Sequence, residues 1–140
     1  MRALVLSGLA LLPFPAFCQV VVDNYCFELS EQSPVKFELR TYYDAASDWS
    51  AGYVKYAKSS VPISIVVSDT QDEESGADRP LQTSTTWVEI VDGRVAGEYR
   101  MVSQGTQLVS MTYDKKPGGR HFDFTNNTNI DVSLEKGCQW

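Results

Sequence analysis

Hydrophobic and polar side chains alternate along much of the chain beyond residue 18, most clearly over residues 35–43. One side of this segment carries Val35, Phe37, Leu39, Thr41 and Tyr43. The other side carries charged residues and Tyr42. A period of two is typical of a strand with one buried face. No sustained helical period follows, so the pattern predicts a protein built from strands.

The second half of the chain predicts short antiparallel strands joined by tight turns. Strands are expected at 61–68, 87–91, 95–102, 106–113, 121–125 and 130–134. Asp92 and Gly93 both tolerate the positive φ of a type I′ hairpin turn. Gly97 marks a bulge or a close crossing of strands. Residues 87–134 therefore predict a meander of about five strands.

These elements predict an all-β domain, either a small antiparallel β-barrel or a sandwich, with the meander at its C-terminal end. About eight to ten short strands would close up so that few edges stay exposed. Bulky inward side chains favour a filled core. One helical turn is expected within residues 44–49, and the longest loop at residues 69–84.

The first residues have the organisation of a secretory signal. A positive start and an apolar run over residues 3–12 precede Ala16 and Cys18, which are small enough for a signal-peptidase site. The sequence therefore predicts a signal peptide at 1–18 and one β-rich domain at 19–140. Lipidation of Cys18 and retention of the segment as an anchor are the alternatives.

Signal removal leaves two cysteines, Cys26 and Cys138, one near each end of the mature chain. An even number of cysteines in an oxidising compartment predicts a disulfide. The bond would clasp the first strand to the C-terminal tail. We therefore expect a periplasmic or secreted protein, and the form of the signal favours a bacterial source.

Composition and charge exclude several classes of protein. A chain of 140 residues makes one domain, and 43% hydrophobic with 21% charged residues is ordinary globular usage. The net charge of −6 argues against a nucleic-acid partner. One histidine and the cysteine spacing exclude common structural zinc sites. No cofactor, metal or lasting membrane insertion is predicted.

His121 and Asp123 are the strongest candidates for catalysis, because a carboxylate can orient an imidazole for base chemistry. Alternation would turn Phe122 and Phe124 inward and leave the pair on the solvated face. No recognisable nucleophile motif accompanies them. We therefore predict a protein without enzymatic activity, and a hydrolase lacking a known motif is the least favoured possibility.

Two surface features predict binding instead. The acidic residues Asp72, Glu73 and Glu74 lack the spacing of a calcium loop, but their charge would attract a cationic partner. The densest aromatic segment offers Tyr42, Trp49 and Tyr53 as interface anchors, whereas Tyr43 is assigned to the core. We predict that these six residues form one surface that engages a basic protein.

The size of the domain and the placement of its cysteines resemble periplasmic lysozyme inhibitors of the barrel type. The strings nearest to that family's inhibitory motifs are residues 96–99 and residues 103–105, and neither matches. Family membership is therefore not assigned.

Two classes of function follow. The first is an exported, non-catalytic β-domain that binds a protein partner, as an inhibitor or immunity protein does. The alternative is a barrel of the cell envelope that holds a small apolar or carbohydrate ligand in its mouth. The filled core favours the protein partner.

Overall fold

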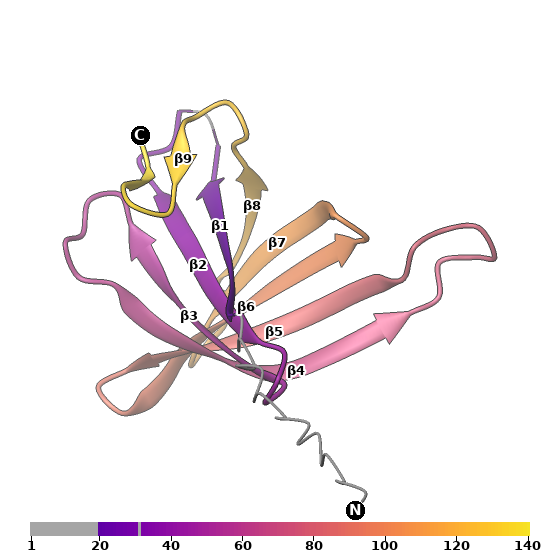
Figure 1. The fold of residues 1–140 in the computed structure, drawn as a ribbon. Coiled ribbons are helices and arrows are strands. Elements are labelled where there is room, and N and C mark those ends of the chain that lie inside the picture. Colours follow the sequence, from indigo (N-terminus) through magenta and orange to yellow (C-terminus); the bar gives the residue numbers. More distant parts are fainter. Residues whose placement is uncertain (1–19, 31) are drawn as a thin grey trace, which may run out of the picture.

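The computed structural model describes residues 20–30 and 32–140 and shows an all-β protein (Figure 1). Eight antiparallel strands form a closed barrel in chain order, and two short strands pair separately. The strands are β1 Val20–Glu28, β2 Lys36–Asp44, β3 Trp49–Tyr56, β4 Ile63–Glu73, β5 Gln82–Val91, β6 Arg94–Gln104, β7 Gln107–Lys115, β8 His121–Asn126, β9 Val132–Ser133 and β10 Gly137–Cys138. The expected barrel is confirmed and the sandwich excluded, while the signal peptide at 1–18 lies outside the described residues.

The core fills the middle of the barrel because each strand turns alternate side chains inward. Fully buried members are Phe27, Phe37, Leu39, Val54, Ile65, Tyr99 and Met111. Phe124 is buried and Phe122 packs against the core, as alternation predicts. Tyr43 is 40% exposed, so its assignment to the core is wrong. It shares the inward face of β2, but it lies where that strand reaches the end of the barrel.

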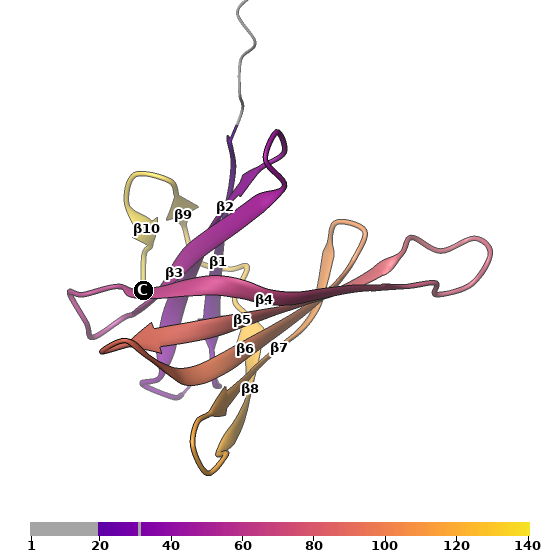
Figure 2. The same cartoon turned by 90° about the horizontal axis from the view of Figure 1, so that it is seen from below.

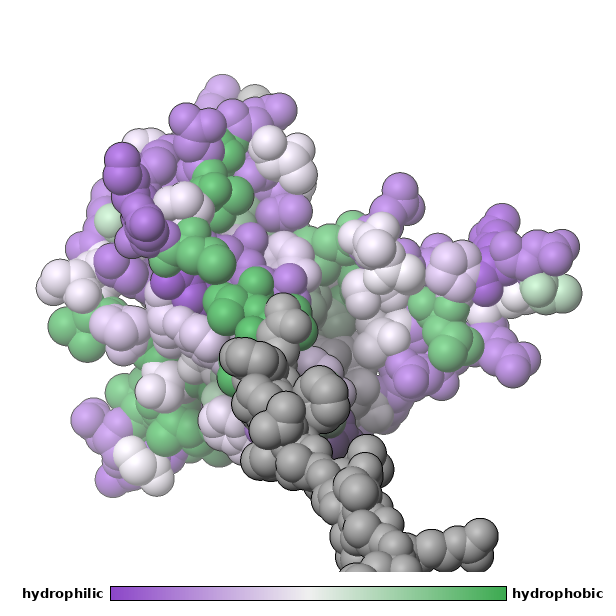
Figure 3. Space-filling model, viewed as in Figure 1, coloured by the Kyte–Doolittle hydropathy of each residue, from purple (hydrophilic) through white to green (hydrophobic). Residues whose placement is uncertain are grey.

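Strands β4 and β5 continue beyond the barrel as a long hairpin, here called the arm, residues 68–86 (Figures 1 and 2). The strands stay paired out to Glu73 and Gln82, so the expected loop at 69–84 is wrong and the connection is only 74–81. The β4 side of the arm escaped prediction because residues 68–73 are exposed on both faces, which removes the apolar alternation. Its tip carries mostly hydrophilic side chains (Figure 3).

Turn chemistry follows the sequence at some connections and departs from it at others. Asp92 and Gly93 have φ values of 49° and 71°, as the predicted hairpin turn requires. The helical turn expected within 44–49 is wrong, because residues 45–48 form turns without a helix. The Asp44 carboxylate accepts a hydrogen bond from the Ala46 N–H at 3.0 Å, which favours a turn.

The C-terminal segment forms a separate hairpin of β9 and β10 outside the barrel. It lies against β1 and β2 (Figures 1 and 2). The strand expected at 130–134 is therefore not part of the barrel, to which residues 87–134 contribute only β5–β8. The Cys26–Cys138 disulfide is confirmed and ties this hairpin to β1 across a sequence separation of 112.

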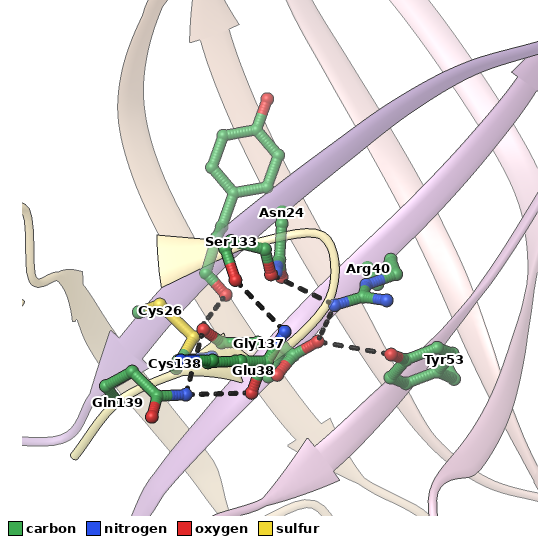
Figure 4. A network of polar contacts seen from close by, with 11 residues as sticks. Asn24, Cys26, Glu38, Arg40, Tyr53, Ser133, Gly137, Cys138 and Gln139 are labelled. Atoms are coloured by element: carbon green, nitrogen blue, oxygen red, sulfur yellow. Dashed lines mark hydrogen bonds and ion pairs between the residues drawn. A yellow bond between two sulfur atoms is a disulfide. The ribbon is translucent and has the colours of Figure 1, made fainter. Parts of the chain in front are cut away.

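A polar network beside the disulfide also holds the C-terminal hairpin (Figure 4). The buried Glu38 carboxylate accepts hydrogen bonds from the Cys138 N–H and the Tyr53 hydroxyl, both at 3.1 Å. It also pairs with Arg40 at 2.9 Å. Arg40 and Asn24 donate to the Ser133 carbonyl oxygen. The C-terminal hairpin of the chain thus covers the outer face of β2 around Glu38 and Arg40.

Within the described residues there is no helix long and apolar enough to cross a membrane.

Candidate functional site

A pocket of about 550 Å³ opens at the end of the barrel where β4 begins and β5 and β7 end. We call it the mouth. Its apolar walls are Val35, Ile63, Val91, Ala96, Phe122 and Phe124. Its polar lining is Tyr56, Glu89, Tyr113, Lys115, Lys116 and Arg120. A concave, largely apolar site with a few polar groups is the usual form of a small-molecule site.

Glu89 is the least expected member of this pocket. It pairs with buried Ile65 across β4 and follows Trp87 by two positions, so its side chain shares the inward face of β5. It is 6% exposed, and its Oε2 has no hydrogen-bond partner in the described part of the chain. A buried carboxylate oxygen without a partner is costly, and such atoms often mark a site for a ligand or water.

Gly97 makes room for the Tyr113 ring beside this carboxylate. It is the residue paired with Glu89 on β6, and the ring of Tyr113 occupies the space that a side chain at position 97 would need. The register between β5 and β6 shifts directly after this pair. The predicted bulge or close crossing at Gly97 is confirmed.

Three tyrosines surround Glu89 inside the barrel. The hydroxyls of Tyr56 and Tyr99 lie 2.9 Å apart. Burial raises the pKa of Tyr56, Tyr99 and Tyr113, and the negative charge of Glu89 raises all three further. The phenols therefore stay protonated at neutral pH, and the mouth has a polar floor under apolar walls.

The rim of the mouth is basic. Lys116 pairs with Glu98 at 3.0 Å, and the Arg120 guanidinium lies 5.9 Å from the centre of the Phe122 ring. Among the described residues no ion pair involves Lys115 or Arg120. The part of the chain that the structure describes thus leaves two rim cations without an ion pair, although the net charge of the whole chain is −6.

The three predicted aromatic anchors lie on the outer face of β2 and β3, where Tyr42 pairs with Ala51, the position midway between Trp49 and Tyr53 on β3. Trp49 is 58% exposed and lines a second pocket with Val66 and Thr70, at the base of the arm. Tyr42 lies on the outer face of β2, half-buried. Tyr53 lies under Arg40 at 5.6 Å, and its hydroxyl is used by the polar network around the C-terminal hairpin.

The predicted acidic residues lie on and beside the arm. Asp72 and Glu73 are exposed at the end of β4, and Glu74 follows in the connection. The Asp72 carboxylate accepts a hydrogen bond from the Thr83 hydroxyl at 2.6 Å. Trp49 and these carboxylates share the end of the molecule that lies opposite the mouth along β4.

His121 lies on the solvated face of β8, as expected. Its Nδ1 is 2.7 Å from Asp114 and its Nε2 is 3.3 Å from Asp123. The hydrogen bond to Asp114 raises the pKa of His121 most, and Asp123 raises it further. No group of three or more histidine, cysteine, aspartate or glutamate side chains in the described ranges is placed to hold a metal ion.

Sequence reasoning missed Glu89 and the basic rim. The signal for Glu89 was present, because alternation from Trp87 puts this charged residue on the inward face. Lys115, Lys116 and Arg120 lie around Pro117, between the strands predicted at 106–113 and 121–125, where no alternation indicates the direction of a side chain. Their common location depends on closure of the barrel.

No protein-family model, curated protein or solved structure matches this chain. Its function is therefore argued from the geometry of the site.

Proposed function

We propose that this protein is an exported, non-catalytic β-barrel that binds a small amphipathic molecule in its mouth. One observation carries the proposal: in a pocket with mainly apolar walls, the buried Glu89 has a carboxylate oxygen for which residues 20–30 and 32–140 supply no hydrogen-bond partner. An eight-stranded barrel is wide enough either to be filled by side chains or to hold one small ligand. Here the middle is filled, and the pocket lies at one end.

Binding suits this site better than catalysis does. The groups around Glu89 are phenols whose pKa is raised by burial, so they supply hydrogen bonds but not a nucleophile at neutral pH. His121, the side chain best suited to general base chemistry, lies on the outer face of β8 with its two carboxylates. A site that orients a ligand without transforming it fits these groups.

Export is part of the proposal. The disulfide is consistent with an oxidising compartment. Together with the signal expected at 1–18, it supports a periplasmic or secreted location.

A fluorescent probe tests binding at the mouth. Anilinonaphthalene sulfonate has apolar rings and one anionic group, and we expect saturable binding with one dye per chain. Ile63→Trp fills the mouth and Val91→Trp narrows its rim, so each should lower the affinity about tenfold or more, as steric exclusion from a pocket does. Two variants are used so that, if one of them misfolds, the other still tests the mouth.

Ser64→Trp is the matched control, because Ser64 lies on the outer face of the same strand as Ile63 and is exposed. Circular dichroism would establish that all three variants are folded. Equal dye binding by the wild type and by folded Ile63→Trp and Val91→Trp would exclude the mouth as the binding site.

A second candidate function, binding of a basic protein, is favoured by the exposure of Trp49 beside the acidic arm. Large exposed aromatics are common interface anchors, and the negative charge would speed association with a cationic partner.

Lysozyme is the first basic protein to test, by surface plasmon resonance. Trp49→Ala should lower the affinity, and Glu73→Lys with Glu74→Lys should slow association at low salt. If both variants bind as the wild type does, this surface is not the interface.

A further inference from the structure

We infer that the molecule bound in the mouth carries an amine at its inner end and an acidic group at its outer end, joined by an apolar segment. The inference rests on the proposed function and names the ligand class for the same site. Three independent features of the mouth, its floor, rim and walls, each select one part of such a molecule.

The floor selects a hydrogen-bond donor with positive charge. Glu89 Oε2 is buried without a hydrogen-bond partner among the described residues, although hydrogen bonding to the Glu89 carboxylate contributes to the raised pKa of Tyr99 and Tyr113. The hydroxyls of Tyr56 and Tyr99 are hydrogen-bonded to each other. A ligand ammonium would supply both the missing hydrogen bond and the countercharge. Charge-assisted hydrogen bonds are about twice as strong as neutral ones, so an amine should bind better than an alcohol.

The rim selects an anion. Lys115 and Arg120 lie at the opening without ion-pair partners in the described part of the chain, and Lys116 has only the exposed Glu98. This concentration of cations opposes the net charge of −6 of the whole chain. Guanidinium and ammonium groups bind carboxylates and phosphates by charge-assisted hydrogen bonds.

The walls select an apolar middle. Ile63, Val91 and Ala96 come from three adjacent strands, β4, β5 and β6, and Phe122 and Phe124 come from β8. Apolar surface that leaves water contributes affinity roughly in proportion to its area, without fixing orientation. Orientation would therefore come from the two ends.

Four probes with one common chain separate these features: aminooctanoate with terminal amine and carboxylate, octylamine, octanoate and octanol. Binding would be followed at neutral pH by the methyl resonances of Ile63 and Ala96. We expect aminooctanoate to bind most tightly and octanol most weakly. Glu89→Gln should weaken octylamine and aminooctanoate by about tenfold or more, the cost of one hydrogen bond to a charged group, and leave octanoate unchanged.

Lys115→Ala combined with Arg120→Ala should have the opposite selectivity, weakening octanoate and aminooctanoate but not octylamine. Glu135→Gln and Lys55→Ala are matched controls, because both side chains are exposed and neither lines the mouth. These two variants should bind all four probes as the wild type does.

The outcomes separate the inference from the proposed function. Saturable shifts at Ile63 and Ala96 with equal affinity for octylamine, octanoate and octanol would overturn the inference but support binding at the mouth. The same holds if Glu89→Gln binds octylamine normally. Absence of shifts with all four probes would overturn both.

Discussion

At the scale of single residues, Gly97 decides the form of the barrel interior. It pairs with Glu89, and the Tyr113 ring lies against its Cα where any larger residue would place a side chain. The Tyr113 ring therefore occupies a space, close to the buried Glu89 carboxylate, that exists only because position 97 has no Cβ. The requirement here is close approach, since Gly97 does not have a positive φ.

Gly97→Ala should therefore destabilise the fold. The added methyl overlaps the Tyr113 ring, which is confined by Tyr99 at a centroid distance of 4.5 Å. Overpacking of this kind costs about 1–3 kcal/mol in the free energy of unfolding, measurable by urea denaturation. Ser64→Ala, at an exposed position of β4, serves as the control. An unchanged midpoint for Gly97→Ala would show that the ring can move away freely.

At the scale of elements, the C-terminal hairpin has little stability of its own. Strands β9 and β10 have two residues each, and an isolated hairpin of that length is not stable in water. Its position depends on the Cys26–Cys138 disulfide and on the contacts of Glu38 with Cys138. The hairpin in turn covers the Glu38 carboxylate.

Replacing both cysteines by serine should lower the free energy of unfolding by about 2–5 kcal/mol, the usual cost of losing a native disulfide. The loop closed by the bond is long, which places the expected loss in the upper part of this range. Denaturant unfolding measures the loss, and amide exchange at Gln139 should become faster. A double variant with wild-type stability would mean that the polar network alone holds the hairpin.

The elements also show what sequence periodicity can and cannot find. Strand β2 was predictable because one of its faces meets the core, so the apolar residues alternate. The outer half of β4 was not predictable, because residues 68–73 are exposed on both faces and are all polar, so no alternation marks the strand. The segment around Val132 was correctly predicted as a strand, but its partner could not be deduced, since it pairs with β10, which has only two residues and shows no alternation.

At the scale of the whole molecule, the barrel encloses a set of tyrosines whose pKa is raised. Burial raises the pKa of Tyr56, Tyr99 and Tyr113 above the ordinary value of 10.0. Burial and the charge of Glu38 also raise the pKa of Tyr53 to about 12. In the unfolded chain these phenols lose their protons near the ordinary value, so the folded state binds more protons at alkaline pH.

Stability should therefore be fully present below pH 10 and should fall as the pH rises toward the higher pKa values of the folded state, by proton linkage. We expect tyrosinate absorbance to rise together with the loss of circular dichroism. Tyr99→Phe removes the most deeply buried of these phenols and should reduce the loss of stability above pH 10. Independent ionisation of all tyrosines at the ordinary pKa in an intact fold would contradict this account.

The architecture was largely predictable and the candidate site largely was not. Alternation and turn residues suffice for a closed antiparallel fold, and two cysteines suffice for the disulfide. The mouth, however, draws on side chains from β3 to β8, including Glu89 and Arg120, which become neighbours only after the barrel closes. Alternation from Trp87 predicts that Glu89 points inward. It does not predict that Glu89 Oε2 lacks a hydrogen-bond partner in the described residues, because that depends on contacts between distant strands.

The strand order has a consequence for how the protein folds. Every pairing in the barrel joins strands adjacent in sequence except β1 with β8, which meet through only two residue pairs, Phe27 with Asn126 and Glu28 with Thr125. The entropy of bringing distant parts of the chain together is thus concentrated in one late step. Cys26 lies directly beside this seam. The Cys26–Cys138 bond joins β1 to the segment that follows β8, so in an oxidising environment it would tether the two strands whose meeting closes the barrel.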